Sequence, residues 1–206
     1  MSGRVLHAQL HLLDRQLVDQ ADGHLAGKVD DVELDLDSDP PVVAALISGR
    51  ERIPAGRIAE VGTAITVVAK ASISTGMTTG PRSTSSTRSL EPEMRLNELL
   101  GFRVVDLDGD VLGSVADVRL VQDGPLLTSM QRALRVDGLI VVENRATRLF
   151  GYERHVGPAL LRRLVHSRLG QVWYLPWHDI DRIADSTVTT RTWRPDLQPL
   201  EEMARY

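Results

Sequence analysis

The residues best suited to chemistry are the aspartates of Asp106-Leu107-Asp108-Gly109-Asp110, whose spacing matches the start of a calcium-binding loop. Such a loop needs glycine at its sixth position and usually glutamate at its twelfth. Counted from Asp106, these positions hold Val111 and Asp117. The stretch therefore fails the test for a calcium site. We interpret it as a hairpin turn, because Asp-Gly between apolar residues favours that structure.

A second acidic pattern covers residues 30–39 and includes Asp35, Asp37 and Asp39. The sixth position counted from Asp35 is Pro40, so this segment also lacks the glycine of a calcium loop. Apolar and acidic residues alternate from position 32 onward, which indicates a half-buried strand with a solvated acidic face. Weak binding of a divalent cation to that face is the alternative.

No other group of residues has the spacing of a catalytic or metal-binding site. The six histidines lack the H-E-x-x-H spacing of a zinc helix, and the absence of cysteine excludes disulfides, thiolate metal sites and a cysteine nucleophile. A G-x-S-x-G nucleophile turn and a phosphate-binding glycine loop are also missing. We interpret His178-Asp179 as part of a surface loop. We therefore expect a non-enzymatic protein with no catalytic residues, no metal, no cofactor and no small-molecule substrate.

The elements around these residues occur twice in the chain. Residues 18–32 and 105–118 both read V-D-x-D-G-x-x-x-G-x-V-x-D-V when one residue is dropped from the first copy. The match continues in Ile53-Pro54 and Leu175-Pro176, and it indicates an internal duplication. Each copy predicts a hairpin followed by further strands, with glycine supplying the backbone freedom of the turn. The structural turn residues that we expect are Gly23, Gly27, Gly109 and Gly113.

The order of these motifs is a Leu-Leu pair, the hairpin, a valine-rich strand pair and an (I/L)-P segment. This order resembles the PRC-barrel family, the small β-barrel named after the cytoplasmic domain of the photosynthetic reaction-centre H subunit. It is also similar to the C-terminal domain of the bacterial ribosome-maturation factors. The resemblance covers roughly residues 8–68 and 95–190. It implies a mainly β fold with two tandem small PRC-like β-barrels, and the family's barrels are similar to adaptor modules rather than enzymes.

The duplication and the composition together predict the domain organisation. Thirteen of the eighteen residues from 72 to 89 are Ser, Thr or Gly, which predicts a flexible linker. Residues 1–7 show no pattern, and we expect them to be loose. The predicted parts are a first barrel over 1–70, the linker over 71–93, a second barrel over 94–193 with a helical insertion over 144–170, and a loose tail over 194–206.

The insertion over residues 144–170 is strongly basic. It holds six arginines and one acidic residue, a charge of +5, which leaves −9 on the rest of a chain whose net charge is −4. Pro158 and Gly170 predict a helix over 157–170, and its leucines make one apolar stripe. A cap on the second barrel and contact with an anionic membrane surface are alternatives to a protein-binding role. The partner-binding residues that we expect are Arg154, Arg162, Arg163, His166 and Arg168.

Composition and charge limit the remaining classes of function. The net charge of −4 argues against general nucleic-acid binding, which needs a basic face. No apolar run approaches the ~18–20 residues that span a bilayer, and the first residues lack a signal-peptide pattern. We therefore expect a cytoplasmic protein, with membrane association as an alternative. The sequence predicts a scaffold module that binds a protein partner or itself. An accessory role in RNA or ribosome maturation is the alternative that the resemblance leaves open.

Overall fold

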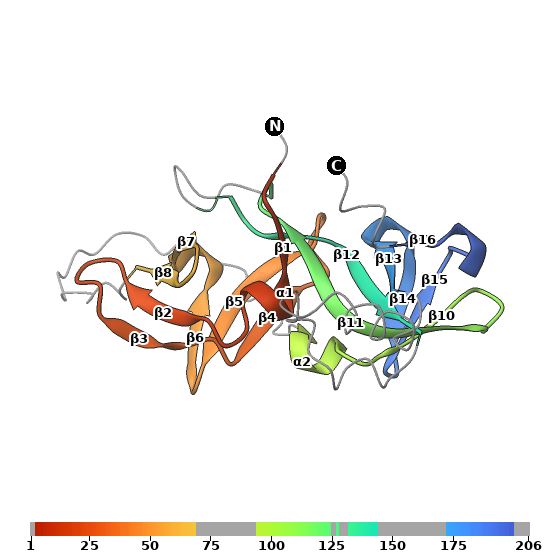
Figure 1. The fold of residues 1–206 in the computed structure, drawn as a ribbon, viewed down its shortest axis with the longest axis horizontal. Coiled ribbons are helices and arrows are strands. Elements are labelled where there is room, and N and C mark those ends of the chain that lie inside the picture. Colours follow the sequence, from red (N-terminus) through yellow and green to blue (C-terminus); the bar gives the residue numbers. More distant parts are fainter. Residues whose placement is uncertain (1–2, 69–93, 125–126, 128–131, 144–171, 200–206) are drawn as a thin grey trace, which may run out of the picture.

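The computed structural model describes residues 3–68, 94–124, 127, 132–143 and 172–199. Its fold is mainly β, as expected, with only short helical turns (Figure 1). The expected linker over 71–93 and the insertion over 144–170 lie outside the described residues. The same holds for the five expected partner-binding residues, Arg154, Arg162, Arg163, His166 and Arg168.

Each half of the chain contains the same series of elements. The first half consists of β2 (Gln16–Asp19), β3 (Leu25–Lys28), β4 (Asp31–Asp35), β5 (Val42–Ser48), β6 (Glu51–Pro54), the 3-10 helix η1 (Ala55–Arg57), β7 (Ile58–Val61) and β8 (Ile65–Val67). The second half consists of β10 (Arg103–Val105), β11 (Val111–Val121), β12 (Arg135–Val142), β13 (Val172–Pro176), the 3-10 helix η3 (Trp177–Asp179), β14 (Ile180–Ala184) and β15 (Thr187–Thr190).

The two halves also repeat the same strand pairing. In the first half β2 pairs antiparallel with β3, Leu17 opposite Gly27, and parallel with β8. In the second half β10 pairs antiparallel with β11, Val104 opposite Gly113, and parallel with β15. The difference is that β11 is one long strand where the first half has β3 and β4. One curled sheet runs along β14, β15, β10, β11, β12, β5 and β4, and a smaller sheet has the order β3, β2, β8, β7.

The expected turn glycines lie in and after the two equivalent hairpins. Gly23 and Gly109 lie in the loops between the paired strands with φ of 71° and 86°, the left-handed region that favours glycine. Gly113 follows the second hairpin, where a Cβ atom would lie 2.4 Å from the carbonyl oxygen of Val142. Gly27 occupies the matching place in the first half, where a Cβ atom would lie 2.6 Å from the Ser48 hydroxyl. Gly23 and Gly109 thus permit the turns, and Gly113 permits the close approach of β11 and β12.

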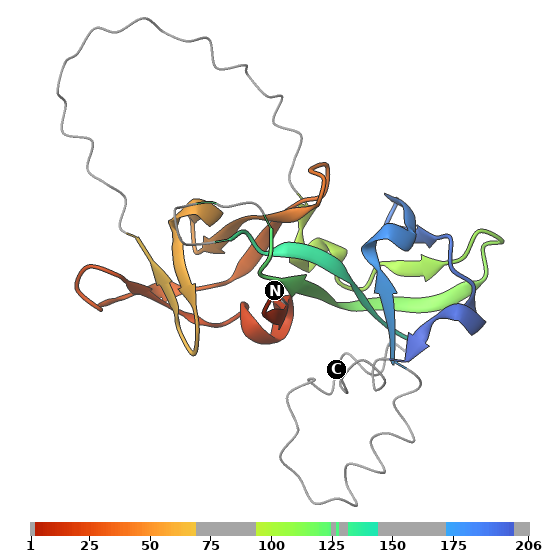
Figure 2. The same ribbon diagram turned by 90° about the horizontal axis from the view of Figure 1, so that it is seen from above.

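The N-terminal segment of each half crosses over and packs on the other half. The first such segment is β1 (Val5–His7) followed by α1 (Ala8–His11), and β1 pairs with β11, Leu6 opposite Leu120. The second is β9 (Met94–Arg95) followed by α2 (Leu96–Leu99), and β9 pairs with β4, Met94 opposite Leu34. Figures 1 and 2 both show α1 beside β11 at the centre of the molecule. Each half is therefore completed by a segment of the other.

The two halves meet at equivalent strands. β5 and β12 pair antiparallel, with Val42 opposite Arg135. The flanking backbone hydrogen bonds run from Val43 N–H to the Leu134 carbonyl and from Val136 N–H to the Pro41 carbonyl, each 2.8 Å long. Because Val42 and Arg135 hold the same place in the repeat, the halves are related by an approximate two-fold axis through this strand pair.

Two buried aspartates of the repeated V-x-D-V pattern hold the exchanged segments. The Oδ1 atom of Asp117 accepts a hydrogen bond from the Gln9 N–H of α1 at 2.8 Å. In the same way, the Oδ1 atom of Asp31 accepts one from the Asn97 N–H of α2 at 3.2 Å. Asp117 is 3% exposed and Asp31 is 7% exposed. Burial raises the pKa of Asp117 to about 6.

The buried hydrophobic side chains of both halves form one continuous cluster. Leu6 and Leu12 of the first exchanged segment, and Leu96 and Leu99 of the second, are almost fully buried in it. Burying one such side chain stabilises a fold by about 1.5–3 kcal/mol. The exchange therefore contributes a substantial part of the packing, and the halves do not have separate cores.

Both chain ends of the described structure differ from the expectation of loose segments. Val5–His7 form β1, because their backbone pairs with the free edge of β11. From Arg194 onward, the 3-10 helix η4 (Arg194–Asp196) and β16 (Gln198–Pro199) fold back, and β16 pairs with β13. Leu197 is buried, and Arg194 forms an ion pair with Glu143 at 2.6 Å. These contacts offset the ordering entropy that a free tail would keep.

The acidic face of β4 is not solvated as expected. Glu33 is only 8% exposed, because β9 of the second half pairs along that edge of β4. The Glu33 carboxylate accepts a hydrogen bond from Arg52 Nε at 2.5 Å and lies 3.9 Å from Arg95. The buried charge is thus matched by cations from both halves, one of which the sequence places more than 60 residues away.

Candidate binding site at the junction of the two halves

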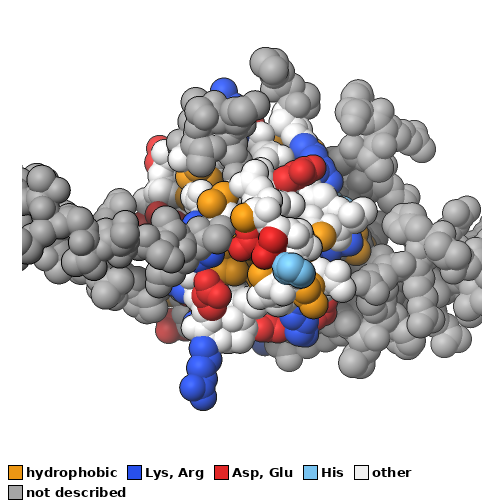
Figure 3. All heavy atoms as spheres, turned by 90° about the vertical axis from the view of Figure 1, so that its left-hand side faces the viewer, with side chains coloured by type: hydrophobic (Ala, Val, Ile, Leu, Met, Phe, Trp, Pro, Cys, Tyr) orange, Lys and Arg blue, Asp and Glu red, His pale blue; other side chains and the backbone are white. Residues whose placement is uncertain are grey.

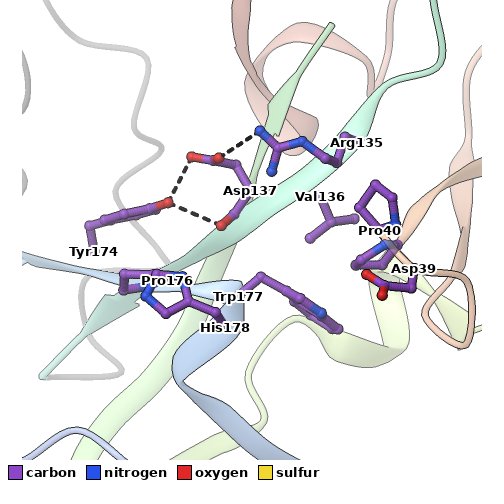
Figure 4. Close-up of a pocket in the computed structure, with 10 residues that line it drawn as sticks. Asp39, Pro40, Arg135, Val136, Asp137, Tyr174, Pro176, Trp177 and His178 are labelled. Carbon is purple, nitrogen blue, oxygen red and sulfur yellow. Dashed lines mark hydrogen bonds and ion pairs between the residues drawn. The ribbon is translucent and has the colours of Figure 1, made fainter. Parts of the chain in front are cut away.

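An open hollow of about 270 Å³ lies where the two halves meet (Figure 4). The loop between β4 and β5 forms one wall, and the start of β12, the end of β13 and η3 form the rest. We call this site the junction hollow. It is lined by Asp39, Pro40, Pro41, Arg135, Val136, Asp137, Tyr174, Pro176, Trp177 and His178.

A charged network forms the base of the junction hollow. The Tyr174 hydroxyl donates a hydrogen bond to Asp137 Oδ2 at 2.7 Å, and Arg119 Nε lies 3.3 Å from the same oxygen. The Arg119 guanidinium also lies 4.9 Å from the centre of the Tyr174 ring, within the range of a cation–π interaction. Arg135 contacts Asp137 at 3.1 Å and Asp123 at 2.9 Å. Two arginines and two aspartates therefore balance one another, and their contacts fix the positions of the side chains.

This network keeps the Tyr174 hydroxyl protonated. Burial and then the hydrogen bond to Asp137 raise the pKa of Tyr174 well above its usual range. The bidentate contact with Arg135 lowers the pKa of Asp123, so this carboxylate stays ionised. The Tyr174 hydroxyl is thus a fixed hydrogen-bond donor to Asp137.

The rim of the junction hollow is more accessible than its base. Figure 4 shows the Trp177 ring extending toward Asp39 and Pro40, with Val136 beside them. The His178 side chain is 82% exposed, and its Nε2 lies 3.5 Å from Asp179. His178 is thus on the surface as expected, although it lies in the 3-10 helix η3 rather than in a loop. The rim therefore offers an aromatic ring, apolar walls and one exposed carboxylate.

The first half lacks the side chains that make this site. Strand register places Ala44 where the second half has Asp137, and Arg52 where it has Tyr174. At the start of η1, Ala55 and Gly56 stand where η3 has Trp177 and His178. The backbone is the same in both halves, so the fold does not require the aromatic and charged residues of the junction hollow.

The aspartates that resemble a calcium loop are used by the hairpin itself. Asp106 is 5% exposed, and its Oδ1 accepts hydrogen bonds from the N–H groups of Asp108 at 3.1 Å and Asp110 at 2.9 Å. The described part of the chain contains no group of three or more His, Cys, Asp or Glu side chains that could hold a metal ion. Within the same ranges, no helix is long and apolar enough to cross a membrane.

His7 and His11 lie together within the first exchanged segment, at the ends of β1 and α1. The His7 backbone N–H donates a hydrogen bond to His11 Nδ1 at 2.8 Å, and the two ring centres are 5.9 Å apart. Burial, followed by the nearby His11 and Arg119 side chains, lowers the pKa of His7 to about 4. We assign this pair to the packing of β1 and α1 on β11, because its neighbours are elements of the fold.

Sequence reasoning missed the junction hollow, although one signal pointed to it. In the sequence, His178-Asp179 stands where the first copy has Gly56-Arg57, which is a difference at a position shared by both repeats. Asp39 and Arg135 belong to different copies, and only the pairing of β5 with β12 brings them together. On the end face of the first half, the acidic, basic and hydrophobic side chains that the structure describes are interspersed (Figure 3).

A scan of the chain against models of known protein families found no match, and a search of curated protein sequences found no similar sequence.

Proposed function

We propose that this protein is a non-enzymatic protein-binding module, made of two tandem PRC-barrel-like halves joined by a flexible linker over residues 71–93. The shared strand order and pairing of the two halves support this architecture. The resemblance to adaptor barrels supports a binding role. In this proposal the module recognises its partner through the junction hollow.

One observation carries the proposal. The second half places Tyr174, Trp177, His178 and Asp137 around a hollow, where the same backbone in the first half bears Arg52, Ala55, Gly56 and Ala44. Residues that the fold does not need, gathered at one concave site, favour a role in binding.

The size of the hollow favours a side chain of a partner over a free metabolite or cofactor. Small-molecule sites usually measure about 300–1,000 Å³ and enclose most of their ligand. The junction hollow holds about 270 Å³ and is open to solvent. Its polar base is already satisfied by internal hydrogen bonds and ion pairs, so a ligand gains mainly from contact with the rim.

Co-purification from cells that express the protein tests this proposal. Tagged wild-type protein, a Trp177→Ala variant and a Trp193→Ala variant are compared by mass spectrometry of the bound proteins. Trp193 is the control for loss of a tryptophan, because it is 44% exposed and lies outside the junction hollow, whereas Trp177 is half-buried in it. We expect the set of bound partners to be depleted with Trp177→Ala and unchanged with Trp193→Ala.

Circular dichroism and thermal melts of the two variants show whether each keeps the fold. If both variants are folded and the Trp177→Ala variant retains every partner of the wild-type protein, the junction hollow is not the recognition site and the proposal is wrong.

A further inference from the structure

We infer that the junction hollow receives an arginine side chain from the basic insertion of a second copy of this chain. The inference rests on the proposed function and names the partner that the site recognises. Four observations lead to it: the charge of the hollow, the shape of its rim, the division of charge along the chain and the place where the insertion is attached.

The junction hollow offers a negative charge that the described residues leave without a partner cation. In its base, Arg119 and Arg135 are balanced by Asp123 and Asp137. At the rim, Asp39 is exposed, and no arginine, lysine or histidine of the described ranges forms an ion pair with it. A cation that enters the hollow therefore meets an available carboxylate above a neutral base.

The rim has the shape and chemistry that suit an arginine side chain. Pro40 and the half-buried Trp177 ring supply apolar surface for the aliphatic stem (Figure 4). The face of a tryptophan ring attracts a guanidinium, and Asp39 supplies a carboxylate beside it. An anionic side chain would instead lie against Asp39 and the electron-rich face of the ring.

The chain itself supplies the cations. Residues 144–170 carry +5 and the remaining residues carry −9, so two copies attract each other when the insertion of one approaches the body of the other. The arginines available for this contact are Arg154, Arg162, Arg163 and Arg168 of the insertion.

The insertion is attached at the far end of the strands that line the junction hollow. The insertion leaves after Glu143, at the end of β12, and returns at Val172, at the start of β13. The junction hollow lies at the opposite end of these strands, beside residues 135–137 and 176–178. β12 is eight residues long, roughly 26 Å at 3.3 Å per residue. Two copies can exchange insertions reciprocally around a two-fold axis, and the concentration dependence of association distinguishes this arrangement from a contact within one chain.

A charge-swap experiment tests the inference by sedimentation velocity of the full chain over a range of concentrations. One variant carries Asp39→Arg in the hollow, and the other carries Arg162→Glu, Arg163→Glu and Arg168→Glu in the insertion. We expect wild-type protein to self-associate, more weakly in 0.5 M salt than in 0.05 M salt. We expect each variant alone to associate at least about tenfold more weakly, and an equimolar mixture of the two to associate again, because opposite charges then meet.

Two further variants make the result specific. Asp108→Arg introduces the same charge change at an exposed position of the β10–β11 loop and should associate like wild type. Trp177→Ala should weaken association without a change of charge. A wild-type protein that stays monomeric at every concentration, an Asp39→Arg variant that associates like wild type, or a mixture that stays monomeric would each overturn the inference. A monomeric wild type whose bound partners still depend on Trp177 would leave the proposed function standing.

Discussion

The buried pair His7 and Asp117 predicts an unusual dependence of stability on pH. Both groups lie where the exchanged segment packs on β11, and burial shifts their pKa values in opposite directions, to about 4 for His7 and to about 6 for Asp117. Between pH 4 and 6, we expect the free energy of unfolding of the Asp117→Asn variant, minus that of wild type, to rise with pH. We expect His7→Gln to make it fall with pH over the same range.

The sign follows from which state binds the proton. The pKa of Asp117 is 3.8 in the unfolded chain and about 6 in the folded protein, so the folded protein binds this proton more tightly. The stability that protonated Asp117 contributes below pH 3.8 is therefore lost as the pH rises to about 6. The pKa of His7 is 6.5 in the unfolded chain and about 4 in the folded protein, so the unfolded chain binds this proton more tightly. The stability that neutral His7 contributes above pH 6.5 is therefore lost as the pH falls to about 4. Between pH 4 and 6 the two effects cancel.

The magnitude follows from the size of the shifts. A difference of one pKa unit between the folded and unfolded states corresponds to about 1.4 kcal/mol. Asp117 therefore accounts for about 3 kcal/mol between its two pKa values, and the partly accessible His7 for somewhat less. Urea unfolding of wild type and both variants at half-unit pH intervals measures the difference directly. Comparison with wild type removes the contribution of all other titrating groups. If the difference between Asp117→Asn and wild type does not change by at least about 1 kcal/mol between pH 4 and 6, the reasoning is refuted.

Two further predictions concern the equivalent glycines and the linker. Gly113→Val should destabilise the protein by about 3 kcal/mol or more, because its Cβ would lie 2.4 Å from the Val142 carbonyl oxygen. Gly27→Val should cost less, about 1–3 kcal/mol, because its Cβ meets only the movable Ser48 hydroxyl and the main cost is the strain of valine at a φ of 135°. Equal thermal shifts in the two variants would contradict this. Limited proteolysis should cut between residues 72 and 89. The two fragments should elute together from a sizing column, because they share exchanged strands and one core. Separation of the fragments without denaturant would show that the strand exchange is wrong.

The local elements were largely predictable from the sequence. The Asp-Gly turns and the flanking valines predicted the hairpins at Gly23 and Gly109 and the further strands that follow them. These signals depend on residues that are neighbours along the chain, and a turn or a strand period can be recognised within a few positions.

The partners of those elements were not predictable in the same way. Glu33 had the pattern of a solvated strand residue, and its burial depends on β9, which arrives from the other half of the chain. Residues 1–7 had no periodic pattern, because β1 is three residues long and gains its order from β11. The junction hollow likewise joins Asp39 to Trp177, which no local spacing relates.

The sequence by itself determined that the chain is a duplication rich in strands, that its turns fall at Asp-Gly and that its charge is divided between one basic insertion and an acidic remainder. Only the tertiary structure decided that the two copies exchange their first strands, share one core and form a hollow between them. The physical reason is that local patterns report which face of a strand is buried, whereas free strand edges and apolar surface are satisfied by any complementary segment within reach. Both copies offer equivalent edges, so the choice between pairing within a copy and exchange between copies is made by the packing of the whole chain.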